Sequence, residues 1–107
     1  MKVVKFREAL SKLILQNKKT LTWSLFDDKD LSAGEIVSFL IWETKKEFAK
    51  AKLTNVKETT FGELTEEDWD GHEKFPSEEE LYKTYSKYYN YQIDKDTPLK
   101  VIKFELV

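Results

Sequence analysis

The stretch that decides the fold runs from residue 35 to residue 60 and reads EIVSFLIWETKKEFAKAKLTNVKETT. Its first part, EIVSFLIW, is rich in β-branched and aromatic residues, and a polar turn around Thr44–Lys46 separates it from the second part. Alternating positions of the second part project to opposite faces, one set being Phe48, Lys50 and Lys52 and the other Ala49, Ala51 and Leu53. The pattern predicts two strands joined by a turn, with a half-buried face.

Three elements are predicted on the N-terminal side of this strand pair. Val3, Val4 and Phe6 predict a short strand. The next apolar residues recur at the spacing of one helical face, which predicts a helix over residues 6–17. The segment TLTWS, residues 20–24, predicts a strand, and residues 26–34 predict a turn that uses the backbone freedom of Gly34.

Two helices are predicted on the C-terminal side. Thr65 precedes Asp68 by three positions, which is a capping-box pattern, and Gly71 is placed to end the short helix that follows. Ser77 is the predicted N-cap of a longer helix, with Glu80 as its capping-box partner.

The last segment, LKVIKFELV at residues 99–107, predicts a closing strand. The predicted order is then β-α-β-β-β-α-α-β, without repeats or a linker. This order favours an α+β fold in which a small mixed sheet curls into a pseudobarrel with flanking helices. A chain of 107 residues has room for one such domain, so we expect residues 1–107 to form a single unit.

The composition excludes several classes of protein. There is no cysteine, which removes disulfides, thiol catalysis and thiolate zinc sites. No apolar run approaches the roughly 20 residues that span a bilayer. We therefore expect a soluble, cytoplasmic protein without a membrane partner.

The charges are unevenly distributed. Residues 1–26 are basic, with Glu8 as their only acid, whereas residues 63–80 are acidic, with Lys74 as their only base. A net charge of −2 and a pI near 5.5 argue against a protein that coats DNA without specificity. A local basic patch would still suffice to hold one phosphate.

No metal and no cofactor are expected. His72 is the only histidine, and a metal site needs more ligands than it can supply, so a structural or surface role is favoured for it. A calcium-loop pattern that begins at Asp28 fails, because Gly34 comes one position late and Phe39 stands where a glutamate is required.

The segment NKKTLTWS, residues 17–24, is a candidate site. Threonine becomes a nucleophile when a base takes its proton, and a lysine serves as that base when burial lowers its pKa. Lys19 and Thr22 are the candidates, and the acidic segment supplies, chiefly in Glu73, a carboxylate that could orient the lysine or activate a water. Because Lys19 and Thr22 would face opposite sides of a regular strand, Lys19 must lie in the preceding turn. The alternative is a solvated lysine beside threonines chosen for β propensity.

The aromatic residues also allow two interpretations. Trp23 and Trp69 have faces that can stack on bases, and the adjacent lysines Lys18 and Lys19 can contact phosphate. Aromatic residues at helical spacing, such as Tyr85 and Tyr89, equally suit a core.

Together, the motifs resemble the ASCH domain of the PUA-like superfamily. The resemblance rests on KKTLTWSLFDDKDLSAG (18–34), the strand pair after it, ELTEEDW (63–69), SEEELYKTYSKYY (77–89) and the terminal LKVIKFELV. It implies a PUA-like small mixed β-barrel whose cleft serves RNA or nucleoside binding, in a setting of translation or RNA metabolism.

Bacterial members of this family that are similar to the chain deacetylate N4-acetylcytidine with a lysine, a threonine and a glutamate. Their motif is K-T-x-T-x-R, and Lys19, Thr20 and Thr22 match its first three fixed positions. The resemblance implies that Lys19 is the base and Thr22 the nucleophile. Glu73 is the best match for the glutamate, and Ser24 stands where the motif has arginine.

Three functions therefore compete. The first is an RNA- or nucleoside-binding module, with Lys18, Thr20, Trp23, Ser24 and Trp69 as its binding residues. The second is an amidohydrolase that acts on N4-acetylcytidine through Lys19, Thr22 and Glu73. The third is a protein-interaction domain that uses the acidic residues 63–80.

Overall fold

The computed structural model describes residues 1–26 and 29–107. Asp28 and part of the turn predicted at residues 26–34 lie outside the described residues. In chain order the elements are β1 (Val3–Phe6), α1 (Glu8–Leu15), β2 (Leu21–Ser24), β3 (Ile36–Ile41), β4 (Glu47–Thr60), the 3-10 helix η1 (Phe61–Glu63), α2 (Glu66–Trp69), α3 (Glu78–Tyr89) and β5 (Pro98–Leu106).

The strands form one mixed sheet in the order β1-β3-β4-β5-β2. The pair β1–β3 is parallel, and the other three pairs are antiparallel. The long strand β4 pairs with β3 through its first half and with β5 along most of its length, so it forms the spine of the sheet. The predicted α+β fold with a curled mixed sheet is confirmed.

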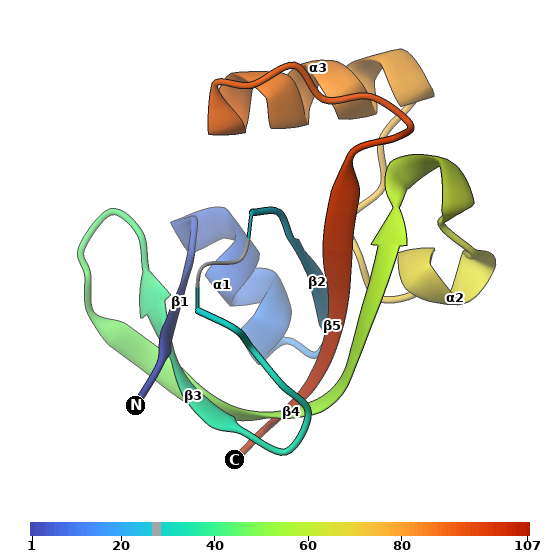
Figure 1. Cartoon of the computed structure of the whole chain (residues 1–107). Helices are drawn as coiled ribbons and strands as arrows, with labels where there is room; N and C mark the ends of the chain where they lie inside the picture. Colours follow the sequence, from blue (N-terminus) through green and yellow to red (C-terminus); the bar gives the residue numbers. More distant parts are fainter. Residues whose placement is uncertain (27–28) are drawn as a thin grey trace.

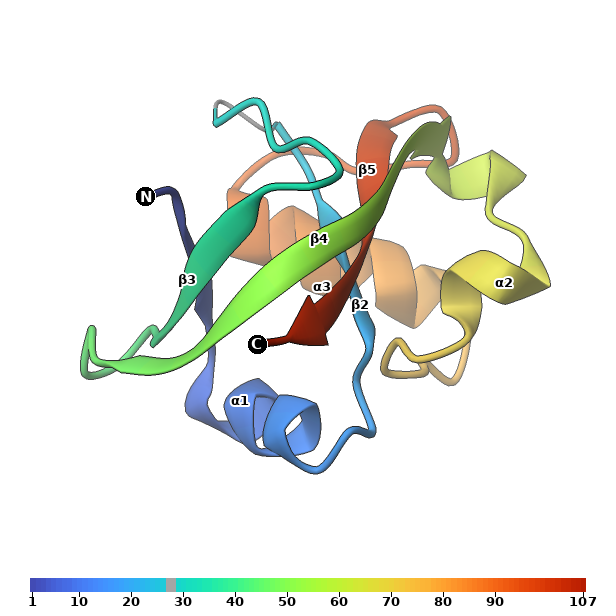
Figure 2. The same cartoon turned by 90° about the horizontal axis from the view of Figure 1, so that it is seen from below.

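The curl of the sheet brings its two edge strands to either side of α1. Figure 1 shows α3 lying across one end of the curled sheet, and Figure 2 shows α1 at the open side of the curl, between β1 and β2. Register shifts interrupt the ladders between Phe39 and Leu40 and between Leu53 and Asn55. Such bulges bend a strand and increase its twist, and here they accompany the curl.

The buried residues form two clusters. One contains Phe6, Ile14, Phe39, Ala51 and Leu53, with α1 packed into the concave face of the sheet. The other lies between β2, β5 and α3 and contains Trp23, Phe61, Leu81, Ile93 and Leu99, among others. The candidate site lies beside the second cluster.

The two predicted helices after β4 are present, and their caps explain where they begin. At α2, the Thr65 side chain accepts a hydrogen bond from the Asp68 backbone N–H, and the Asp68 carboxylate accepts one from Thr65 N–H. At α3, Ser77 accepts from the Glu80 backbone N–H, and Asn90 in the left-handed region ends the helix. The Ser77 cap lacks the reciprocal bond that a full capping box requires.

The first helix is shorter than the predicted range of residues 6–17. Phe6 belongs to β1, where its ring packs edge-on against Phe39 at 4.8 Å between ring centroids. At the other end Asn17 adopts a left-handed φ of 60°, which stops the helix. The 3-10 turn η1 was not predicted, because a single turn carries no periodic signal.

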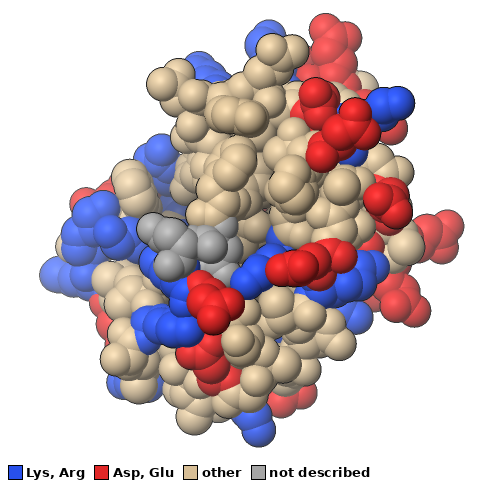
Figure 3. Space-filling view, viewed as in Figure 1, with Lys and Arg blue, Asp and Glu red and all other residues tan. Residues whose placement is uncertain are grey.

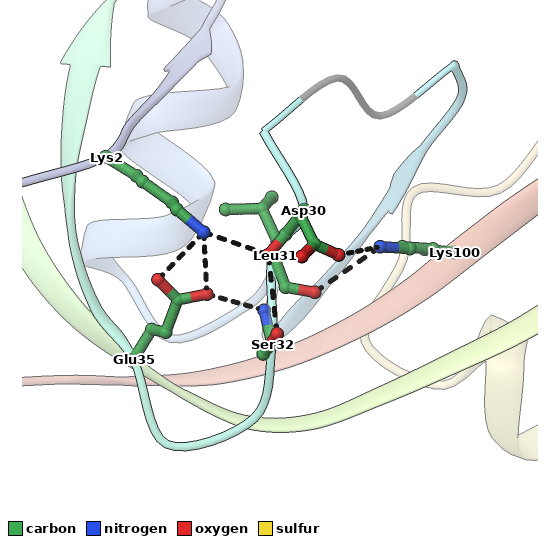
Figure 4. A network of polar contacts seen from close by, with 6 residues as sticks. All are labelled: Lys2, Asp30, Leu31, Ser32, Glu35 and Lys100. Atoms are coloured by element: carbon green, nitrogen blue, oxygen red, sulfur yellow. Dashed lines mark hydrogen bonds and ion pairs between the residues drawn. The ribbon is translucent and has the colours of Figure 1, made fainter.

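A polar network holds the connection between β2 and β3 against the sheet (Figure 4). Lys2 Nζ donates to the Asp30 carbonyl at 2.9 Å and pairs with the Glu35 carboxylate at 3.1 Å. Glu35 in turn accepts from the Ser32 backbone N–H at 2.7 Å. The network fixes the start of β3 relative to the N-terminus.

Candidate functional site

The connection between α1 and β2 determines where Lys19 lies. The backbone N–H groups of Lys18 and Lys19 both bond to the Leu13 carbonyl, at 2.9 and 3.2 Å, so the chain turns sharply after the helix. Lys19 therefore precedes β2 rather than belonging to it, as the candidate site requires. Its side chain is 2% exposed, which is unusual for lysine.

The loop after α2 determines where Glu73 lies. Gly71 has a φ of +88°, and its carbonyl accepts a hydrogen bond from Thr20 N–H at 2.9 Å. A Cβ atom at Gly71 would lie 2.0 Å from Thr20 Oγ1, so no other residue fits there without a shift. This close approach docks the loop onto the start of β2 and brings Glu73 against Lys19.

Lys19 and Glu73 form an ion pair, with 2.6 Å between Nζ and Oε2, in which the Lys19 side chain is buried and the Glu73 side chain is 26% exposed. Burial lowers the pKa of Lys19, although the Glu73 carboxylate opposes this shift. For Glu73, burial acts to raise the pKa, but Lys19 and the neighbouring His72 outweigh burial and lower it. At a pH between the two pKa values, both side chains are charged. At a pH above the pKa of Lys19, its side chain is a neutral amine.

His72 completes the polar cluster from within the core. Its ring stacks on Trp23, with centroids 3.7 Å apart and an interplanar angle of 12°. Burial, followed by the charge of Lys19, lowers the pKa of His72 from 6.5 to about 4, so the ring is neutral at pH 7.

The hydrogen bonds of His72 determine its tautomer. Nδ1 lies 2.8 Å from the Glu73 carbonyl, which only accepts, so Nδ1 carries the proton. Nε2 is then an acceptor and takes a hydrogen bond from the Tyr85 hydroxyl at 3.3 Å. Burial raises the pKa of Tyr85 well above 10, which keeps this hydroxyl protonated. His72 thus links the loop, β2 and α3.

A cavity of about 550 Å³ lies between β1, β2, the start of α1 and α3. Thr22 and Ser24 line it from β2, Glu73 lines it from the loop after α2, and Tyr85 lines it from α3. Its volume falls within the range of about 300 to 1,000 Å³ that is common for small-molecule sites. Lys19 does not line the cavity itself and contacts it through Glu73.

The candidate binding residues are only partly gathered at this cavity. Ser24 and Trp23 line it, but one face of Trp23 is covered by His72 and its Nε1 donates to the Asp68 carbonyl at 3.0 Å. Lys18 is exposed, and neither it nor Trp69 lines the cavity. Thr20 contacts Gly71 and lines a second cavity of about 430 Å³ instead.

The acidic segment 63–80 is not a uniformly solvated surface. The Asp68 side chain is buried, accepts the Thr65 backbone N–H and pairs with Lys57 at 2.8 Å. Glu73 points toward Lys19. Two of the acids in this segment therefore serve the packing of the loop.

Several cavity residues were missed in the sequence. Arg7 follows β1 and Trp42 follows β3, and both line the cavity although they are far apart in the chain. Tyr85 was assigned to the core by its spacing, and it both packs against the second cluster and lines the cavity. His72 was given a structural or surface role, and its buried ring, stacked on Trp23, has the structural one. A signal for Arg7 existed, because it is the only arginine of the chain.

Within residues 1–26 and 29–107, no group of three or more His, Cys, Asp or Glu side chains is placed to hold a metal ion. No helix in this part of the chain is long and apolar enough to cross a membrane.

Solved structures with the same fold exist. The chain is similar to protein EF3133 from Enterococcus faecalis V583, with a TM-score of 0.80 and 20% identity over 100% of this chain and 76% of that one. It is similar to an ASCH domain from Lactobacillus crispatus JV V101, with a TM-score of 0.70 and 14% identity over 98% of this chain and 79% of the other. Hypothetical protein PH0355 gives a TM-score of 0.74 and 26% identity over 100% of both chains.

These likenesses show an ASCH-like fold, a PUA-like pseudobarrel. The resemblance seen in the sequence is confirmed at that level. No family model matches the chain, and no curated protein matches it.

Proposed function

We propose that the cavity binds a cytidine-type nucleoside and hydrolyses an acyl amide on its base, with N4-acetylcytidine as the expected substrate. The observation that carries this proposal is the ion pair between the buried Lys19 and the part-exposed Glu73, because Glu73 shares the cavity lining with Thr22. Burying a charged pair costs free energy that an apolar pair would not, and pairs with shifted pKa values gather at functional sites.

The expected reaction has two steps and uses Thr22 of the cavity lining together with Lys19, which lies behind Glu73. The neutral amine of Lys19 takes the proton of Thr22, whose Oγ1 attacks the acetyl carbon. The bond from that carbon to N4 breaks, and the lysine returns the proton to the leaving amine of cytidine. Water then hydrolyses the acetyl ester on Thr22, which releases acetate and restores the hydroxyl. Glu73 holds Lys19 in place throughout.

Substitution of the nucleophile tests the proposal. Purified wild type is incubated with N4-acetylcytidine, and release of cytidine is followed by chromatography. Thr22→Val keeps the shape of the side chain and removes the hydroxyl, so turnover should fall by at least roughly 1,000-fold. The matched control is Thr84→Val, since Thr84 lines the same cavity from α3 and has no role in the reaction. Unchanged turnover in Thr22→Val would remove this threonine as the nucleophile.

A second candidate function is recognition without turnover, in RNA metabolism or translation. It is favoured by the mixed lining of the cavity, where aromatic side chains stand beside cations. Aromatic faces stack on bases, and cations contact phosphate. Titration with cytidine and short RNA, followed by the tryptophan fluorescence, tests it. Binding without any release of cytidine from N4-acetylcytidine would select this function.

A further inference from the structure

We infer that Arg7 and Lys5 bind a phosphate group of the ligand at the β1 side of the cavity, so that a phosphorylated cytidine is preferred over the free nucleoside. This inference rests on the proposed function, because it assigns the substrate class of the same cavity. It is carried by the charges that line the cavity and by the aromatic residues that hold them.

The charges in the cavity lining are predominantly positive. Among the described residues that line it, Lys5, Arg7 and Lys29 are cationic, and Glu73 is the only acid. Since Glu73 is already paired with Lys19 at 2.6 Å, its charge is neutralised locally. At the β1 side of the cavity, the charges of Arg7 and Lys5 remain, although the whole chain carries a net charge of −2.

Arg7 is held by aromatic rings rather than by an acid. Its guanidinium carbon lies 5.6 Å from the Trp42 ring centroid and 5.8 Å from that of Tyr88. Both rings also line the cavity. Among the described residues no carboxylate lies within ion-pair distance of Arg7 or Lys5. A guanidinium that lies near aromatic rings rather than a carboxylate keeps its N–H donors available for an anion.

Lys5 approaches the same aromatic ring, with Nζ 5.4 Å from the Trp42 centroid. Lys45 lies over this ring as well, at 3.7 Å, but it does not line the cavity. Like charges gathered around one ring repel each other, and a bound anion would relieve that repulsion. Figure 3 shows basic side chains toward the left of this face, where β1 and the β3–β4 hairpin lie, and acidic ones toward the start of α3.

The N-terminus of α1 is not the anion contact. The Glu8 backbone N–H already donates to the Glu43 carboxylate at 3.0 Å. Arg7 occupies the N-cap position of α1, but its side chain makes no cap hydrogen bond. Substitution of Arg7 therefore removes a cavity cation without removing a helix cap.

A binding measurement tests the inference without requiring turnover. Cytidine and cytidine 5′-monophosphate are titrated by calorimetry into wild type, Arg7→Gln and Lys5→Gln. The matched control is Lys45→Gln, which removes a cation from the same ring but outside the cavity. We expect the monophosphate to bind wild type roughly 10- to 100-fold more tightly than cytidine, as charge-assisted hydrogen bonds allow. Arg7→Gln should abolish most of this preference, Lys5→Gln part of it, and Lys45→Gln little.

The outcomes separate this inference from the proposed function. Equal binding of the two ligands by wild type, or a preference that survives in Arg7→Gln, overturns the phosphate site even if N4-acetylcytidine is hydrolysed. Absence of binding of either ligand also overturns it. An Arg7-dependent preference supports it even if no hydrolysis occurs.

The phosphate has two possible sources, a mononucleotide or an RNA chain. A third titration uses the trinucleotide UpCpU, in which the phosphate 5′ to cytidine is a diester. Tighter Arg7-dependent binding of the trinucleotide assigns the site to RNA, and tighter binding of the monophosphate assigns it to free nucleotides.

Discussion

Thr20 and Gly71 are in direct contact, since Thr20 N–H donates to the Gly71 carbonyl at 2.9 Å and Thr20 Oγ1 occupies the space where a Cβ of residue 71 would stand. The contact joins the start of β2 to the loop that carries Glu73. Through it, two segments that are more than fifty positions apart in sequence place a lysine and a glutamate together.

Gly71→Ala should therefore lower stability and disturb the site. The new Cβ would lie 2.0 Å from Thr20 Oγ1, at a φ of +88° that alanine disfavours. We expect a loss of about 2 to 4 kcal/mol in the free energy of unfolding, measured in urea. The matched control is Gly34→Ala, where φ is +93° and no atom lies within 4 Å of the new Cβ. It should lose only about 1 kcal/mol, from backbone strain. Equal losses in the two variants would argue against the contact.

The Lys19–Glu73 pair should show strong coupling in a double-mutant cycle. Glu73→Gln leaves the Lys19 ammonium buried without its partner, and Lys19→Met leaves the carboxylate without its cation. Each single change should cost about 2 to 4 kcal/mol of unfolding free energy, and the double variant less than the sum. Denaturant titrations of the four proteins measure this coupling. Additive losses would mean that the pair contributes no interaction of its own.

His72 should make stability depend on pH between about 4 and 6.5. Its pKa is about 4 in the folded protein, below its ordinary 6.5, so the unfolded chain binds more protons in this window. Stability should therefore be complete above pH 6.5 and decline as the pH falls toward 4. The full shift corresponds to about 3 kcal/mol at 1.36 kcal/mol per pH unit. In His72→Phe, which keeps a ring beside Trp23, the decline between pH 6.5 and 4.5 should become shallower. An unchanged slope would contradict the buried, neutral state of His72.

Hydrolysis should increase with pH as Lys19 loses its proton. Burial lowers the pKa of this lysine below 10.5, and the Glu73 charge counteracts that shift. In Glu73→Gln the counteracting charge is gone, so the hydrolysis rate should begin to rise at a lower pH than in wild type. This shift in pH is expected even if the maximal rate also changes. Rates of cytidine release across the pH range measure this, with Glu67→Gln, an exposed acid of α2, as the control. A rise that does not move would assign the titration to another group.

The sequence predicted most of the fold because its local signals agree with the tertiary structure. The strand pair around residues 35–60 and the caps at Thr65 and Ser77 appear where the pattern indicated. The prediction of the first helix extended too far, because Phe6 follows the same hydrophobic spacing although it belongs to a strand.

The site was predicted only in part. Glu73 was named as a partner for Lys19 from the chemistry of the acidic segment and from the resemblance, since nothing in local spacing relates positions so far apart. The stacking of His72 on Trp23 follows from the docking of the loop after α2 onto β2, and the approach of Arg7 to Trp42 follows from the pairing of β1 with β3. No periodic pattern encodes either contact. Burial of Lys19 also contradicts the usual preference of lysine for solvent, so only its surroundings could reveal it.

The measurement that tests the central claim most directly is hydrolysis of N4-acetylcytidine by wild type and by Lys19→Met, followed by chromatography at pH 8. Near-UV circular dichroism of both proteins confirms that the variant is folded. The account predicts catalytic release of cytidine by wild type and none above background by the folded variant. Release at the wild-type rate by Lys19→Met, or no release by wild type, would contradict the claim that this buried lysine serves an amide hydrolase.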